Sequence, residues 1–298
     1  MNAKWITPAV TSLDRRGQAD LEGNAALYKF LIDGGIDGIL ILGSIGEFFA
    51  IPAEQKKNLI LHAASTIQKR VTLYVGTGSM ILEECIELSN FALKHGADAA
   101  VVISPYYFQL PEASQIEFYG EIARRIDGPM ILYNFPARTG YSLSAETVLR
   151  LAREHENIIG IKDTTDEMSH TRSLIQTVKK YRPDFAVYSG FDEYFMHNLL
   201  CGGDGCIAGL ANFAPSLSSE FVKAAKSGDL GKIACCQKKI DALMEIYSIG
   251  SQFVPIIKEA VLQCGVPISA ECTEPLPSVS PDQRERIHCL LKETGILS

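Results

Sequence analysis

A lysine at the end of an apolar run is the residue best suited to covalent chemistry in this chain. Lys162 closes the run IIGIK, and Asp163 follows it directly. Transfer out of water favours the neutral amine of a lysine, and a neutral amine can attack a carbonyl carbon to form a Schiff base. The alternative is a structural lysine that pairs with Asp163 at the rim of a sheet. The residues at this position leave both interpretations open.

Two further segments contain groups that would complement such an amine. In Gly43-Ser44-Ile45-Gly46-Glu47, the glycines allow a tight turn whose N–H groups can point at a carboxylate. In YNFPARTG, Tyr133 ends an apolar run and is a candidate for proton transfer. A plain turn and a half-buried core tyrosine are the respective alternatives.

Two more segments place polar side chains directly after apolar runs. Tyr106 and Tyr107 are adjacent in SPYYF, so their side chains point in different directions and at least one faces solvent or a partner. Asp192 and Glu193 are adjacent in SGFDEY. Such a pair offers acceptors for hydroxyl groups, unless both acids are merely solvated.

Short apolar runs rich in β-branched residues precede all of these segments and recur along the chain. Segments with helical periodicity separate them, for example Asp20–Asp33, Pro52–Ile67, Leu82–His95 and Glu146–Glu154. Strands that alternate with helices are expected to be parallel and joined by right-handed crossovers. The predicted strands are Trp5–Val10, Gly38–Leu42, Leu73–Gly76, Ala99–Ser104, Met130–Asn134, Ile158–Lys162, Ala186–Ser189 and Cys206–Ala208.

Eight such units predict an α/β fold, a closed (β/α)8 TIM barrel with its active site at the C-terminal ends of the strands. The strands are continuously apolar, as expected when both faces of a sheet are covered. The main alternative is a doubly wound open sheet, which usually has a glycine-rich turn after its first strand. Here Thr11-Ser12-Leu13-Asp14 follows the first run, without GxGxxG. The pattern therefore favours the barrel.

The chain continues well beyond the eighth predicted strand. Helical patterns at Ser216–Ser227, Leu230–Tyr247 and Val254–Gly265 follow it, whereas one helix is enough to complete a barrel. We therefore expect residues 1–225 to form the barrel. Residues 226–298 are expected to pack on the barrel as a C-terminal helical extension.

Composition excludes several classes of partner. The net charge is −7 and no long run of Lys or Arg occurs, which argues against nucleic acid or an anionic membrane surface. No apolar run approaches the roughly 18 residues that span a bilayer, and the segment MNAKWITPAVTSLD does not resemble a signal peptide. The 8 cysteines form no CxxC pair, so we expect reduced thiols in a cytoplasmic protein. Scattered histidines predict no metal site, and nothing indicates a cofactor.

Taken together, the motifs resemble the dihydrodipicolinate synthase / N-acetylneuraminate lyase family of class I (Schiff-base) aldolases. GSIGE at 43–47 is similar to the family's pyruvate-carboxylate loop, and YNFPARTG at 133–140 is similar to its tyrosine motif. GIKDTT at 160–165 looks like its Schiff-base strand, and GGDGCIAGLANFAP at 202–215 looks like its eighth-strand segment. The resemblance covers essentially the whole chain and keeps the motif order.

The resemblance implies catalytic roles. Lys162 would condense with pyruvate or another 2-oxo acid, and Tyr133 would be the general acid and base over the Schiff base. The Ser44 side chain and the N–H groups of Ser44 and Ile45 would hold the pyruvate carboxylate, and Ile207 would pack against the bound pyruvate. Tyr107 would reach into a neighbouring subunit's site and support a Ser44–Tyr107–Tyr133 relay.

The resemblance also implies an assembly and a choice of substrates. It implies a homotetramer built as a dimer of dimers. Ile45 stands where most members have Thr, which removes one hydroxyl donor. Arg138 matches the arginine by which synthases grip a second carboxylate. In contrast, Gly190-Phe191-Asp192-Glu193 looks like the G-x-D-E of the sialate lyases, which holds a polyhydroxyl chain. The NFP, FDEY and NFAP segments look most like the 2-keto-3-deoxygluconate aldolase members.

Three functions remain. The favoured one is an aldolase that reversibly cleaves a 2-keto-3-deoxy sugar acid to pyruvate and an aldehyde. The second is the synthase reaction, in which pyruvate condenses with aspartate semialdehyde. The third is a barrel without catalysis that binds a small ligand, against which the intact Lys162 and Tyr133 argue.

Overall fold

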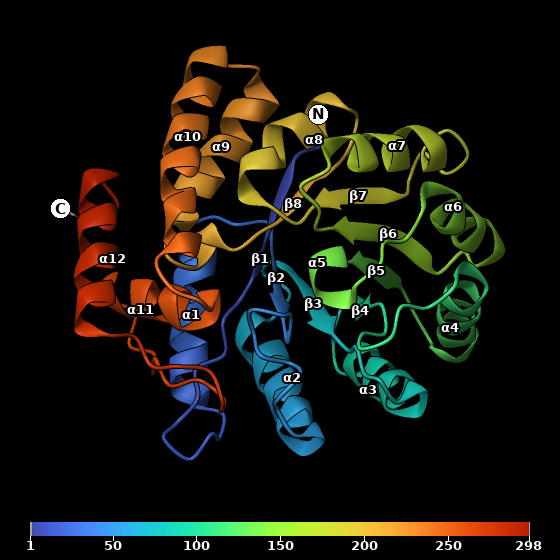
Figure 1. Cartoon of the computed structure of the whole chain (residues 1–298), viewed down its shortest axis with the longest axis horizontal. Coiled ribbons are helices and arrows are strands. Elements are labelled where there is room, and N and C mark those ends of the chain that lie inside the picture. Colours follow the sequence, from blue (N-terminus) through green and yellow to red (C-terminus); the bar gives the residue numbers. More distant parts are fainter. Residues whose placement is uncertain (1, 298) are drawn as a thin grey trace. The chain divides into compact units, whose positions relative to one another are not determined.

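The barrel predicted from the sequence is confirmed. The computed structural model describes residues 2–297, and eight parallel strands close a barrel in the order in which they occur along the chain. Figure 1 shows the strands and helices alternating along the chain. The strands are β1 Lys4–Pro8, β2 Gly38–Ile41, β3 Thr72–Gly76, β4 Ala99–Ile103, β5 Met130–Asn134, β6 Ile158–Asp163, β7 Ala186–Ser189 and β8 Gly205–Ile207.

Helices follow the strands, and additional short helices lie in the loops after β5, β7 and β8. The segment after β8 is helical, as the sequence predicts, whereas the division at residues 225 and 226 stays a prediction. The helices are α1 Leu21–Asp33, α2 Ala53–Ile67, α3 Leu82–Lys94, α4 Glu112–Arg125, α5 Pro136–Thr139, α6 Ala145–Glu154, α7 Met168–Val178, α8 Phe195–Leu200, α9 Pro215–Ser227, α10 Leu230–Leu243, α11 Phe253–Gln263 and α12 Pro281–Glu293, with 3-10 turns η1 Asp192–Tyr194, η2 Leu210–Asn212 and η3 Met244–Ser248.

The described residues form two compact units, each with its own core. One unit comprises residues 2–3 and Tyr74–Ile207, and the other comprises Lys4–Leu73 and residues 208–297. In the first unit, α4, α6 and α7 cover the outer side of β5 and β6 (Figure 1). Their shared apolar core includes Tyr119, Leu132, Leu151, Ile161 and Leu174, all with 0% exposure.

Register places the predicted chemical residues of the first unit side by side. Lys162 on β6 is level with Tyr133 on β5 and with Tyr188 on β7. β6 extends one residue beyond its predicted end, because the Thr164 N–H donates to the Asn134 carbonyl at 2.9 Å and continues the ladder. Lys162 is therefore the last residue but one of its strand.

In the second unit, β1 pairs in parallel with β2, and α9, α10, α11 and α12 follow β8 along the chain. Side-chain caps define the starts of three helices: Asp20 accepts from the Gly23 N–H at α1, Asp229 accepts from the Lys232 N–H at α10, and Ser280 forms a capping box with Gln283 at α12. Among residues 2–297, none of the helices is long and apolar enough to span a membrane.

Candidate active site

Lys162 and Tyr133 lie side by side on neighbouring strands of the first unit. Both residues are buried, with exposed fractions of 4% each. The Lys162 Nζ lies 4.4 Å from the centroid of the Tyr133 ring, and the Phe135 ring stacks on Tyr133 at 5.9 Å between centroids. Within the described residues, no carboxylate forms an ion pair with Lys162. The site thus combines a desolvated amine with an aromatic hydroxyl on the neighbouring strand.

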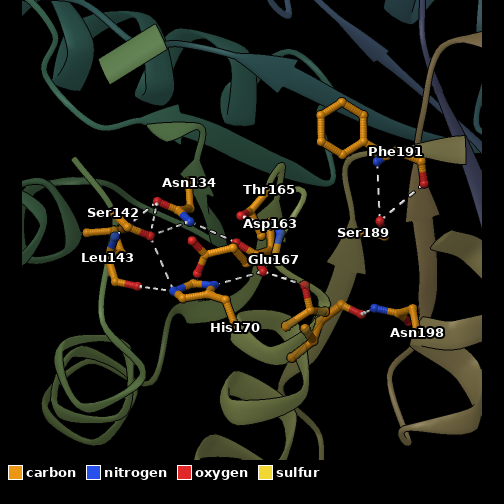
Figure 2. A network of polar contacts seen from close by, with 12 residues as sticks. Asn134, Ser142, Leu143, Asp163, Thr165, Glu167, His170, Ser189, Phe191 and Asn198 are labelled. Carbon is orange, nitrogen blue, oxygen red and sulfur yellow. Dashed lines mark hydrogen bonds and ion pairs between the residues drawn. The ribbon is translucent and has the colours of Figure 1, made fainter. Parts of the chain in front are cut away.

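Asp163 does not pair with Lys162, so the structural alternative for the lysine is wrong. The Asp163 carboxylate is fully buried and accepts hydrogen bonds from the Asn134 Nδ2 at 2.8 Å and the Thr171 Oγ1 at 2.6 Å. His170 Nδ1 lies 3.0 Å from the same carboxylate. Figure 2 shows this cluster, which holds Asp163 on the side of β6 that faces α7. The lysine is therefore left without a counter-charge.

Thr164 is a candidate that the motif analysis did not single out. Its side-chain oxygen is buried and has no hydrogen-bond partner among residues 2–297. A Cβ added to Gly190 would lie 1.8 Å from this oxygen, and the Gly190 N–H donates to the Asp163 carbonyl at 2.7 Å. Any larger residue at position 190 would clash with the Thr164 side chain, which explains why this position is a glycine.

The remaining predicted residues of this unit lie in loops that follow the strands. Asp192 is buried at the start of η1 and Glu193 follows it at intermediate exposure. Arg138 is exposed on α5, with its guanidinium carbon 5.7 Å from the centroid of the Phe135 ring. Ile207 is fully buried at the end of β8.

Tyr107 lies on the surface of the same unit. It is 85% exposed and its φ of +93° is uncommon for any residue other than glycine. The neighbouring Phe108 is 71% exposed, and the two rings meet edge to face at 4.9 Å. Strained, exposed aromatic side chains of this kind are typical of contact surfaces.

Ser44 and Ile45 belong to the other compact unit, in the loop after β2. Leu42 and Glu47 flank this loop with left-handed backbone, at φ values of +54° and +60°. The loop coils on itself, because the N–H groups of Gly46 and Phe48 both donate to the Gly43 carbonyl. Residues other than glycine with left-handed backbone cluster at functional sites, so this loop is a candidate for a binding role.

A buried ion pair fixes the end of this loop. The Glu47 Oε1 and the Lys258 Nζ lie 2.5 Å apart, and both side chains have 0% exposure. The other oxygen of Glu47 accepts from the N–H and the hydroxyl of Thr273, at 2.7 and 2.8 Å. The sequence alone does not indicate this pair, because Lys258 lies on α11, more than two hundred residues beyond Glu47.

Among residues 2–297, no group of three or more His, Cys, Asp or Glu side chains is arranged to hold a metal ion. All 8 cysteines are free thiols. The chemistry that these residues support directly is nucleophilic attack by an amine, with an aromatic hydroxyl beside it.

Comparisons with known proteins identify the family of this chain. Residues 1–294 match the Dihydrodipicolinate synthetase family. The chain is 39% identical over 292 residues to the "Probable 2-dehydro-3-deoxy-D-pentonate aldolase YjhH" of Escherichia coli K12, covering 98% of this chain and 97% of that protein. It is 34% identical over 289 residues to the 4-hydroxy-tetrahydrodipicolinate synthase of Kosmotoga olearia, covering 97% of each.

A solved structure is similar throughout. The protein YagE of Escherichia coli K12, a member of the dihydrodipicolinic acid synthase family crystallised in complex with pyruvate, superimposes with a TM-score of 0.96 at 39% identity. The alignment covers 99% of each chain. The fold, the buried lysine and these relatives define an enzyme of the lyase class, an aldolase. The chain belongs to the dihydrodipicolinate synthetase family.

Proposed function

We propose that this enzyme is a pyruvate-dependent class I aldolase that reversibly cleaves a 2-keto-3-deoxy sugar acid to pyruvate and an aldehyde. The observation that supports it best is Lys162, a buried amine that lies over the Tyr133 ring and has no carboxylate partner among the described residues. A lysine desolvated in this way is activated for attack on a carbonyl. The aldolase named for its pentonate substrate, YjhH, and the pyruvate bound to YagE support the substrate class.

The reaction follows from these two side chains. The Lys162 amine adds to C2 of the 2-oxo acid, and loss of water gives an imine that accepts electrons. Tyr133 removes the proton from the C4 hydroxyl, the C3–C4 bond breaks, and its electron pair enters the imine to give an enamine and the aldehyde. Protonation of C3 and hydrolysis of the imine release pyruvate and regenerate the amine.

The loop after β2 is proposed to bind the carboxylate of the 2-oxo acid. Its internal hydrogen bonds use the N–H groups of Gly46, Glu47 and Phe48, and the Ile45 N–H is not among these donors. We assign the Ile45 N–H, together with the N–H and hydroxyl of Ser44, to the carboxylate, as in an anion-binding backbone nest. Ile45 is buried and offers an apolar side chain in place of a hydroxyl.

The hydroxyl-bearing end of the substrate is proposed to contact hydrogen-bond acceptors and one cationic side chain. Asp192 and Glu193 would accept from the sugar hydroxyls, and Thr164 would add a buried hydroxyl of its own. Arg138, whose planar fork suits oxygen acceptors, would serve a hydroxyl or a terminal acid group. Ile207 would pack against the bound pyruvate.

We expect Asp192→Ala to raise the KM for a 2-keto-3-deoxy sugar acid by about one to two powers of ten, because substrate hydroxyls would lose their acceptor. Steady-state cleavage of a panel of such acids, read by pyruvate release, measures this effect. Asp184→Ala is the matched control, because Asp184 pairs with Arg182 on the surface. An unchanged KM in the Asp192 variant would remove Asp192 from the substrate site.

The synthase reaction is the second candidate, and Arg138 is the observation that favours it. Aspartate semialdehyde brings a second carboxylate, which Arg138 would bind and which Asp192 and Glu193 would repel. Purified enzyme should therefore cleave at least one deoxy sugar acid more efficiently than it condenses pyruvate with aspartate semialdehyde. A condensation that is about a hundredfold more efficient, a difference of nearly 3 kcal/mol, would establish the synthase instead.

We further propose a homotetramer, a dimer of dimers, in which Tyr107 enters a neighbouring subunit's site. Exposed apolar side chains lie at Tyr107 and Phe108, at 85% and 71% exposure, and at Met80, 47% exposed, whose sulfur accepts from the N–H of the adjacent Tyr106. A second copy of the chain is the natural partner for such side chains, because soluble oligomers are mostly symmetric. The 8 free thiols support a cytoplasmic location for the assembly.

Dilution is expected to lower the specific activity in parallel with dissociation of the oligomer, because a monomer would lack the neighbouring Tyr107. Light scattering combined with activity measured over a range of concentrations tests this directly. Tyr107→Ala should show the loss at every concentration, whereas Tyr181→Ala, at another exposed tyrosine of the same unit, should not. A fully active monomer would exclude Tyr107 from the site.

A further inference from the structure

A closed ring of hydrogen bonds lies directly behind Lys162 and Tyr133. Asn134 follows Tyr133 and Asp163 follows Lys162, and the Asn134 Nδ2 donates to the Asp163 Oδ1 at 2.8 Å. The Asn134 Oδ1 accepts from the Leu143 N–H at 3.0 Å. His170 completes the ring, with Nδ1 3.0 Å from the Asp163 Oδ2 and Nε2 2.9 Å from the Leu143 carbonyl (Figure 2).

The ring joins three parts of the first unit that the reaction uses. It fixes the end of β5, which presents Tyr133, and the end of β6, which presents Lys162. Leu143 lies just beyond the YNFPARTG segment, so the ring also closes the loop that contains Arg138 and α5. Side chains of successive strand residues point to opposite faces of a sheet. Asn134 and Asp163 therefore affect Tyr133 and Lys162 indirectly, by fixing the backbone of β5 and β6.

The closest partners of His170 favour its protonated form. Its Nδ1 lies 3.0 Å from a carboxylate oxygen, and its Nε2 lies 2.9 Å from the Leu143 carbonyl and 3.3 Å from the Ser142 hydroxyl. The carboxylate and the carbonyl only accept hydrogen bonds, whereas the hydroxyl can donate or accept. A neutral imidazole has one N–H and would direct a lone pair at one of the two acceptors. Only the imidazolium donates to both. Its charge also balances the Asp163 carboxylate, whose side chain has 0% exposure.

We propose that protonated His170 is a positioning residue for the aldolase reaction: its imidazolium holds the ring Asp163–Asn134–Leu143 and thereby the relative placement of Lys162 and Tyr133. The inference rests on the proposed function. Loss of the proton would leave Asp163 as a buried, uncompensated charge and would open the ring at His170. The enzyme therefore loses its reactive geometry when this single histidine becomes neutral.

The direction of the pH effect follows from the groups that face His170. Burial is the largest single influence and opposes the charged form, but the hydrogen bond and charge of Asp163, the Leu143 carbonyl and the charge of Glu167 together raise the pKa of His170. A pKa raised by folding stabilises the native state fully below the unfolded value and loses this stabilisation as pH rises through the folded value. Activity that depends on the ring should fall over the same alkaline range.

Three enzymes test the proposal: wild type, His170→Gln and His155→Gln. Glutamine retains polar groups but has no charge, so we expect kcat to fall about tenfold to a hundredfold through misplacement of the reacting groups. The KM should change much less. In the wild type kcat falls as pH rises above neutrality, and in His170→Gln this dependence disappears. His155, half-buried at the end of α6 and outside the ring, should retain both the rate and the dependence.

A second measurement needs no variant. In wild-type enzyme labelled with ¹⁵N-histidine, one ring should keep both nitrogens protonated to a higher pH than the ring of His155, because Asp163 raises the pKa of His170 and burial lowers the pKa of His155. A spectrum without such a ring overturns the proposal, as does a His170→Gln enzyme with wild-type kcat and pH dependence. If the wild type forms no pyruvate adduct, the aldolase function fails and the positioning role fails with it. An adduct together with an unaffected variant removes the role of His170 alone.

Discussion

Lys162→Ala is expected to give no pyruvate adduct after borohydride reduction and no measurable turnover. The wild-type enzyme should gain the mass of one reduced pyruvate per chain, because borohydride converts the imine to a stable secondary amine. The variant loses the nucleophile at this position, while its strand β6 still pairs with β5 and β7. Intact-mass measurement and pyruvate release provide the two readouts. Full activity in the variant would contradict the Schiff-base mechanism.

Two other lysines make this experiment specific. Lys258 is buried more completely than Lys162 but forms an ion pair with Glu47, so its amine is occupied by a carboxylate and peptide mapping should find it unlabelled. Lys180 also lies against a tyrosine, with its Nζ 5.7 Å from the Tyr181 ring centroid, but it is exposed. Lys180→Ala should therefore label and turn over like the wild type. Burial without a counter-charge, not burial or an aromatic neighbour alone, distinguishes Lys162.

The sequence was sufficient to predict the barrel because short stretches of sequence show the pattern of each strand and helix. Each strand is a short apolar run, and each polar segment follows one of these runs, so the order of elements could be predicted without knowledge of distant contacts. The end of β6 was missed by one residue. Its final ladder bond is made by the Thr164 N–H to the Asn134 carbonyl, and the apolar pattern contains no sign of that bond.

The residues that support the site were much harder to predict. Asp163 was considered only as a partner for its neighbour Lys162, whereas its real partners Asn134, His170 and Thr171 lie on other elements. The sequence motif that contains Glu47 gave no indication that this residue forms an ion pair with Lys258. Such contacts depend on how side chains alternate across strands and pack on helices, and a single sequence does not specify these distances.

Tyr133→Phe is expected to lower kcat by about 10² to 10⁴, because it removes one positioned group for proton transfer. The aromatic ring of residue 133 remains, so its stacking on Phe135 and its contact with Lys162 are retained and the fold should be intact. Formation of the imine and cleavage of the C3–C4 bond can be separated by stopping the reaction with borohydride. The variant should accumulate adduct while it releases aldehyde slowly.

Tyr119 provides a control for Tyr133, because it is a buried tyrosine whose hydroxyl is expected to have no role in the reaction. The Tyr119 Oη lies 2.9 Å from the Ser104 Oγ and donates to the Val102 carbonyl at 3.2 Å, and the side chain has 0% exposure. Tyr119→Phe leaves these partners unsatisfied, so it should lower the free energy of unfolding by about 1–3 kcal/mol and leave kcat unchanged. The opposite result is expected for Tyr133→Phe, a large loss of rate with little loss of stability. A rate loss below tenfold at Tyr133, accompanied by destabilisation like that at Tyr119, would show that Tyr133 is a core residue.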